Sequence, residues 1–266
     1  MTGADRIAAA FASHGKRAAL MPYLMGGFPD LETSERIGEA CREAGADLLE
    51  LGVPFSDPLA DGPVIHAAGT RALEAGATPG GVLDVGGTLS ARGPVVVMCY
   101  ANVVLAPGAE SFAASLADQG VAGLIVPDLP VEEGDAIRAA CDRQGVALVP
   151  LVAPTTTDER MAAISAEARG FVYAVAVTGT TGERSSLAES FADLVARAGA
   201  HTELPVAVGF GIASPELAVQ AAEAGADGVI IGSRLVRAAG EAYAAGEDPA
   251  VAVGQLVSDF ATALAG

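Results

Sequence analysis

Three carboxylates stand in or just after one apolar segment near the start of the chain. Glu50 lies inside the apolar segment 48–52, and Asp57 and Asp61 lie in the proline-rich loop that follows. A carboxylate in a buried strand is costly unless it is paired or neutralised. Glu50 is therefore either half of a buried ion pair or a general acid and base with a raised pKa. Each aspartate alone could form a turn beside proline, but together the three offer the different environments that separate acid from base.

Glycine-rich loops follow three later apolar segments, at 177–182, at 209–212 and at Gly232-Ser233. Each glycine alone predicts only a tight turn. Glycine also lets backbone N–H groups approach a phosphate, and a helix N-terminus adds positive potential. In barrels of parallel strands, phosphate often binds between the loops after strands seven and eight and a nearby helix. We therefore predict a phosphate site here, with Ser233 capping a helix and donating its hydroxyl.

Lysine and histidine are scarce. Lys16 is the one lysine among 15 basic residues, and it precedes the first expected strand, while the histidines are His14, His66 and His201. A Schiff-base enzyme needs a lysine in its site, and a histidine-based metal site needs clustered imidazoles. The sequence therefore favours chemistry on carboxylates, without a Schiff base or a metal.

Eight short apolar segments without clear alternation recur along the chain, which is typical of parallel strands buried on both faces. The expected strands are Ala18–Met25, Asp47–Leu51, Val95–Cys99, Gly123–Val126, Ala147–Leu151, Phe171–Val175, Pro205–Val208 and Gly228–Ile231. We expect helices between them, at Thr33–Ala44, Ala109–Gln119 and Pro215–Ala224, and across the tail Glu241–Gly266. Glycines past helix ends suit left-handed caps, at positions 45, 120, 145 and 225.

Eight such units predict an α/β fold, a single (β/α)8 TIM barrel domain over residues 1–266 with an N-terminal helix and extra loop helices. An open doubly wound sheet is the alternative. The active site of such a barrel lies at the C-terminal ends of its strands, where the carboxylates and the glycine-rich loops are expected.

The net charge of −18 argues against nucleic-acid binding. No apolar segment is long enough to cross a membrane, and the N-terminus has no signal-peptide pattern. Cys41, Cys99 and Cys141 are odd in number and widely spaced, which favours reduced thiols and a cytoplasmic protein.

The stretch Leu48–Pro63, Leu-Leu-Glu-Leu-Gly-Val-Pro-Phe-Ser-Asp-Pro-Leu-Ala-Asp-Gly-Pro, closely resembles the signature of the tryptophan synthase alpha chain family. The resemblance covers nearly the whole chain, including Pro22-Tyr23, Gly27–Pro29, Tyr100–Asn102, Asp128–Glu133, Phe171–Tyr173, Thr181-Gly182, Gly209–Ile212 and Gly232-Ser233. It implies retro-aldol cleavage of indole-3-glycerol phosphate to indole and glyceraldehyde 3-phosphate, in tryptophan biosynthesis, without a cofactor in this chain.

The resemblance also implies a role for each matched residue. Glu50 matches the proton-transfer group, Asp61 the partner of the indole N–H, and Tyr173 the residue that orients the glutamate. The expected phosphate positions are Gly182, Gly211, Gly232 and Ser233, and those lining the indole pocket are Tyr23, Met98 and Phe210. For the aromatic Tyr23 and Phe210, ordinary packing at the top of the barrel is the alternative. Thr181 lies on a loop expected to close over substrate, and the Gly179–Ser186 loop is expected to be mobile without ligand.

The partner implied by the resemblance is a beta chain that carries pyridoxal phosphate, in an alpha2-beta2 heterotetramer. Pro54 and Asp57 match the loop that contacts it. The chain departs from the common family pattern at Met25, Ala176 and Thr180, which leaves room for altered loop closure or partner dependence.

Two alternatives stay open on the same residues: a stand-alone lyase that releases free indole, and an inactive partner that only activates a beta chain. Two other families of phosphate-binding barrels fit less well. Indole-3-glycerol phosphate synthases rely on a lysine within the barrel, and ribulose-phosphate epimerases on histidines linked to a metal, and this sequence lacks both.

Overall fold

The computed structural model describes residues 1–175, 187–209 and 211–266. The expectations for Ala176, Thr180, Thr181, Gly182 and Phe210, and for the loop at 179–186, lie outside the described residues.

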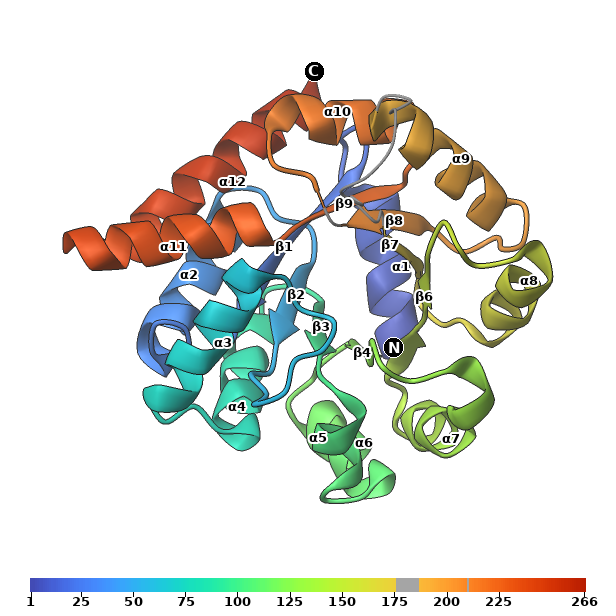
Figure 1. The fold of residues 1–266 in the computed structure, drawn as a ribbon, viewed down its shortest axis with the longest axis horizontal. Coiled ribbons are helices and arrows are strands. Elements are labelled where there is room, and N and C mark those ends of the chain that lie inside the picture. The colour runs from blue at the N-terminus through green and yellow to red at the C-terminus, as the bar shows by residue number, and fades with distance from the viewer. Residues whose placement is uncertain (176–186, 210) are drawn as a thin grey trace.

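The strands of the described residues form one parallel sheet in the order β5-β4-β3-β2-β1-β9-β8-β7-β6. They are β1 (Ala19–Met25), β2 (Leu49–Gly52), β3 (Val95–Met98), β4 (Gly123–Ile125), β5 (Ala147–Val149), β6 (Leu151–Val152), β7 (Val172–Val175), β8 (Val206–Gly209) and β9 (Gly228–Ile231). Figure 1 shows these strands at the centre of the molecule, with helices around them.

The sheet closes at Pro150, which alone separates β5 from β6. Proline has no N–H to donate to a ladder, so the fifth expected strand is divided, with β5 paired to β4 and β6 to β7. The two outermost strands of the sheet are therefore consecutive in the chain. This confirms the predicted barrel, and the open-sheet alternative is wrong.

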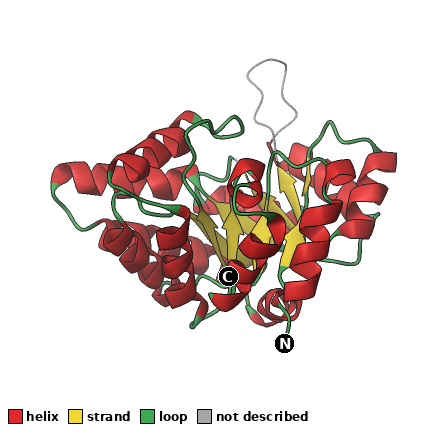
Figure 2. Cartoon of the chain, turned by 90° about the horizontal axis from the view of Figure 1, so that it is seen from below, coloured by secondary structure: helices red, strands yellow, loops and turns green. Residues whose placement is uncertain are grey.

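Helices cover the outside of the barrel, and Figure 2 shows them on both sides of the strands. They are α1 (Gly3–Ser13), α2 (Leu31–Glu43), α3 (Pro63–Glu74), α4 (Pro79–Ser90), α5 (Ala101–Leu105), α6 (Ala109–Asp118), the 3-10 helix η1 (Val131–Glu133), α7 (Asp135–Gln144), α8 (Asp158–Glu167), α9 (Leu187–Gly199), α10 (Pro215–Glu223), α11 (Ser233–Ala245) and α12 (Pro249–Ala265). Within the described residues, no helix has both the length and the apolar character needed to cross a membrane.

The helix ends largely follow the sequence prediction. Gly45, Gly120, Gly145 and Gly225 all have positive φ, as the caps require. Ser214 caps α10 and its hydroxyl accepts from the Leu217 N–H. The tail is not one helix, because Gly246 ends α11 in a left-handed conformation and Asp248 then caps α12.

The expected N-terminal helix, α1, closes the N-terminal end of the barrel. Ile7 is fully buried, and the rings of Phe11 and Phe171 lie 5.6 Å apart. Gly228 of β9 leaves room for this helix, since a Cβ there would lie 2.8 Å from the Phe11 ring. With this end filled by apolar side chains, the opposite end of the barrel is left for a site.

Two aspartates join neighbouring strands at the N-terminal end. Asp47, before β2, donates its N–H to the Leu20 carbonyl (2.9 Å) and accepts the Leu20 N–H with its carboxylate (2.7 Å). Asp227, before β9, makes the same two bonds to Val206 of β8, at 2.9 and 2.8 Å. The repeated Ala-Gly-Ala-Asp sequence thus ends a helix and fixes the next strand.

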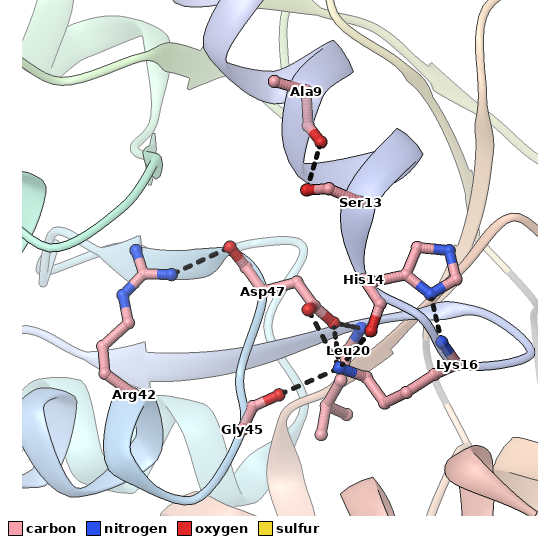
Figure 3. A network of polar contacts seen from close by, with 8 residues as sticks. All are labelled: Ala9, Ser13, His14, Lys16, Leu20, Arg42, Gly45 and Asp47. Atoms are coloured by element: carbon pink, nitrogen blue, oxygen red, sulfur yellow. Dashed lines mark hydrogen bonds and ion pairs between the residues drawn. The ribbon is translucent and has the colours of Figure 1, made fainter.

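The one lysine lies at this N-terminal end of the barrel, and Figure 3 shows its polar contacts. Lys16 Nζ lies 2.9 Å from the Asp47 carboxylate and donates to the Gly45 carbonyl at 3.2 Å. Both charged side chains are largely buried, with exposed fractions of 11% for Lys16 and 13% for Asp47. Lys16 is thus committed to the ion pair that supports the start of β2.

Replacing Lys16 with methionine should lower the free energy of unfolding by about 1–3 kcal/mol, because the largely buried Asp47 carboxylate loses its charged partner. Urea unfolding monitored by circular dichroism measures this loss. The control is Arg17→Met, which breaks an exposed pair with Glu223 and should cost less than about 1 kcal/mol. Equal losses in the two variants would show that burial gives the Lys16 pair no special role.

Candidate functional site

A cavity of about 320 Å³ lies at the C-terminal ends of the strands. The predicted residues that line it are Tyr23, Glu50, Asp61, Met98, Tyr173, Gly211, Gly232 and Ser233. Ile65, Ile212 and Ile230 give it an apolar wall. The structure therefore brings the predicted catalytic residues and the described members of the predicted phosphate-binding group into one cavity.

Glu50 is fully buried in β2, and neither carboxyl oxygen has a hydrogen-bond partner among the described residues. The ion-pair alternative accordingly has no cation to support it among those residues. Burial, and secondarily the nearby Asp61 charge, raises the pKa of Glu50 from 4.5 to about 8. At neutral pH the side chain is therefore mostly protonated, as a proton donor inside a cavity must be.

Asp61 occupies a more polar environment on the loop between β2 and α3. Its Oδ1 accepts a hydrogen bond of 3.0 Å from the Tyr100 hydroxyl. Partial burial raises the pKa of Asp61, but the Tyr100 hydrogen bond and the nearby His66 counteract this. The two cavity carboxyls therefore differ as the sequence predicted: Glu50 has no hydrogen-bond partner in the described part of the chain, whereas Asp61 has one that favours its charged form.

Tyr100 is a site residue that sequence reasoning did not single out. Its hydroxyl also accepts from the Ala60 N–H at 3.0 Å, and its ring stacks on Phe55 with centroids 5.4 Å apart. Asp128 Oδ1 fixes the backbone after Tyr100 by accepting from the Ala101 N–H at 2.9 Å. Tyr100 thus holds the Asp61 loop in place. The available signal was a tyrosine just beyond an apolar strand.

Tyr23 and Tyr173 each lean over a glycine on the neighbouring strand. A Cβ at Gly52 would lie 2.2 Å from the Tyr23 hydroxyl oxygen, and one at Gly209 would lie 2.3 Å from that of Tyr173. Tyr23 is paired in register with Glu50. Burial raises the pKa of both tyrosines well above the usual range, and the nearby Glu50 charge raises it further. Both phenols are therefore neutral groups beside Glu50.

The start of α11 forms the other end of the cavity. Gly232 is the N-cap residue and no side chain caps the helix. The predicted capping role of Ser233 is therefore wrong, since Ser233 is the first helical residue. Gly211 has a φ of 85°, a conformation that favours glycine. An uncapped helix start beside this glycine can bind an anion with its free N–H groups and positive dipole end.

Pro54 and Asp57 differ in exposure, although both were expected at a partner surface. Pro54 is buried, whereas Asp57 is exposed and accepts a 2.7 Å hydrogen bond from Ser56. Leu59 on the same loop is 94% exposed, and Leu105 at the end of α5 is 54% exposed. The exposed surface of the loop is thus partly apolar, and the buried Pro54 is not part of it.

Among the described residues, no three His, Cys, Asp or Glu side chains lie close enough together to hold a metal ion. The three cysteines are free and buried. Burial raises the pKa of Cys41 and of Cys141 to about 12, so these thiols are inert core residues rather than nucleophiles.

The chain is similar to known proteins in both sequence and structure. The sequence model of the tryptophan synthase alpha chain family matches residues 10–264. The tryptophan synthase alpha chain of Gloeobacter violaceus is 51% identical over 236 residues, which cover 87% of this chain and 86% of that protein. Among solved structures, tryptophan synthase subunit alpha from Legionella pneumophila superposes with a TM-score of 0.90 at 35% identity, covering 99% of this chain and 98% of that one.

A structure of Mycobacterium tuberculosis tryptophan synthase gives a TM-score of 0.88 at 39% identity and covers 98% of each chain. The match extends along nearly the full length in both sequence and structure. On this evidence, the chain belongs to the tryptophan synthase alpha chain family.

Proposed function

We propose that this chain is a carbon–carbon lyase that cleaves indole-3-glycerol phosphate to indole and glyceraldehyde 3-phosphate. The observation that carries the proposal is Glu50, a buried carboxyl with a pKa raised to about 8 in a cavity that also holds Asp61 and an uncapped helix start. The cavity thus combines a proton donor, a second carboxylate and an anion site.

The steps of the reaction follow from these groups. Protonated Glu50 gives its proton to indole C3, and the positive charge that develops on the ring is stabilised by Asp61 at the ring N–H. The Glu50 carboxylate then takes the proton of the hydroxyl on the adjacent carbon. The bond from that carbon to C3 breaks, its electron pair returns to the ring, and the carbon becomes an aldehyde. Glu50 regains its proton, so the cycle is redox-neutral and the proposal needs no cofactor in this chain.

The remaining cavity residues have supporting roles in this proposal. Tyr173 orients Glu50, while Tyr23 and Met98 pack against the ring. Gly211, Gly232 and Ser233 hold the phosphate, and for Thr181, Gly182 and Phe210 the roles expected from the sequence remain proposals. Sequestering the ring and chain from water strengthens each electrostatic interaction.

We further propose a tryptophan synthase beta chain as the partner, in an alpha2-beta2 assembly, with pyridoxal phosphate held by that chain. The exposed Asp57 and Leu59, on the loop that carries Asp61 into the cavity, support a partner surface there. Free cysteines fit a cytoplasmic setting.

The discriminating experiment measures indole formation from indole-3-glycerol phosphate, with the chain alone and with a purified beta chain. The proposal expects weak turnover alone and a rise when the beta chain is added. High turnover of the isolated chain would favour the stand-alone lyase. No cleavage in the complex, together with faster conversion of indole and serine by the beta chain, would favour the inactive partner.

Replacing Tyr100 with phenylalanine should lower kcat/KM for this cleavage about 10-fold, because Asp61 loses a hydrogen bond that favours its charged form. The pKa of Asp61 should rise, so the acidic limb of the pH–rate profile should move to higher pH. Tyr243→Phe, which removes an exposed hydroxyl near the C-terminal end of α11, is the control. A lower rate with an unmoved acidic limb would mean that Tyr100 acts only on folding.

A further inference from the structure

Arg234 lines the cavity beside Gly232 and Ser233, as the second residue of α11. It is half-buried. The resemblance assigns it no role, since the phosphate positions matched from the family are glycines and one serine. Its presence at the anion end of the cavity needs a separate explanation.

The local environment disfavours a cation at this place. The first turn of a helix carries the positive end of the dipole, so an arginine there is destabilising unless an anion lies nearby. α11 has no acidic residue in its first turn and no side chain caps it. The helix itself therefore gives no reason for the arginine.

Arg234 also has no protein partner among the described residues, although the chain carries 33 acidic residues against 15 basic ones. Most other arginines are occupied: Arg36, Arg138, Arg160 and Arg197 have carboxylate partners, and Arg42 donates to two backbone carbonyls. A half-buried guanidinium left unpaired in so acidic a protein indicates a ligand of negative charge.

We propose that Arg234 is a phosphate-binding residue, whose guanidinium contacts the phosphate group held at the start of α11. Backbone N–H groups of the helix start and of Gly211 would contact one side of the phosphate, and Arg234 would add a full positive charge. Arginine suits this role because its planar fork of donors matches phosphate oxygens and stays charged at any physiological pH.

The contact would also offset the net charge of −18, which repels a phosphate dianion at long range. A cation inside the cavity supplies local attraction that the surface charge does not. Binding through it should weaken as salt is added, because screening acts on a partly exposed pair. The assignment of the substrate rests on the proposed function, but anion binding at Arg234 does not.

The test uses inorganic phosphate as the probe, with calorimetry on the full chain. Arg234→Gln should weaken phosphate binding about 10- to 100-fold, the range for a charge-assisted hydrogen bond. Arg234→Lys should restore part of it. The matched control is Arg237→Gln, an exposed arginine one turn further along α11, which should bind phosphate like the wild type. Equal affinity in the wild type and Arg234→Gln would overturn the proposal.

Kinetics with indole-3-glycerol phosphate separate this proposal from the proposed function. Arg234→Gln should raise KM about 10- to 100-fold and leave kcat within about 3-fold, because the phosphate lies away from the bond that breaks. The KM of the wild type should also rise more steeply with salt than that of the variant. If the wild type does not cleave this substrate, but Arg234→Gln binds inorganic phosphate more weakly than the wild type, only the proposed function is wrong. A fall in kcat with unchanged KM would contradict the binding role.

Discussion

Replacing Glu50 with glutamine is expected to lower kcat/KM for cleavage of indole-3-glycerol phosphate by at least about 100-fold, the lower end for general acid–base catalysis. Glutamine has nearly the same shape and keeps the cavity filled. It cannot give a proton to indole C3 or take one from the substrate hydroxyl. The loss should therefore appear mainly in kcat, measured as the rate of indole formation.

Glu241→Gln, at an exposed position on α11, is the matched control and should keep full activity. The wild type should also lose activity as the pH rises through about 8, where Glu50 ionises in the free protein. A Glu50→Gln variant that retains a tenth or more of the wild-type rate would remove Glu50 from the mechanism.

The same substitution is expected to stabilise the fold in alkaline solution by about 5 kcal/mol, at about 1.4 kcal/mol for each pKa unit. Glu50 has a pKa of about 8 in the folded chain, whereas its ordinary value is 4.5. Because burial favours the neutral form, ionisation in the unfolded chain draws the protein toward unfolding. The difference from glutamine should be small below pH 4.5, grow between pH 4.5 and 8, and level off above.

Urea unfolding of the wild type and Glu50→Gln at several pH values measures this difference. Subtracting one curve from the other removes the titration of groups that both proteins share. Glu241→Gln should follow the wild type throughout. A constant difference from pH 5 to pH 9 would show that the Glu50 pKa is the same in the folded and unfolded chains. We expect the variant to be more stable but inactive, because the burial of Glu50 costs stability and serves function.

The barrel could be predicted because its signals are local and repeated. Short apolar segments, left-handed glycine caps and Ser214 before Pro215 each act within a few residues, and all were found where expected. Glu50 could be singled out for a similar reason, since a charge within an apolar strand is visible in the sequence. The expected fifth strand, by contrast, is divided at Pro150, because proline has no N–H to donate to the ladder.

The contacts between distant segments were harder to predict. Tyr100 reaches Asp61 across 39 residues, so no spacing pattern reveals their hydrogen bond. The capping role expected of Ser233 failed because the helix begins one residue earlier than a serine cap would require, with Gly232 at the cap. The significance of Arg234 depends on its lack of an acidic partner within the described residues, and a sequence with 33 acidic residues does not reveal that lack.

The most direct test of the account is the simultaneous assay of both products from indole-3-glycerol phosphate, with wild type and Glu50→Gln side by side and a beta chain present. The account predicts indole and glyceraldehyde 3-phosphate in equal amounts from the wild type, and at least about 100-fold less of both from the variant. No product from the wild type, or equal rates from the two proteins, would contradict it.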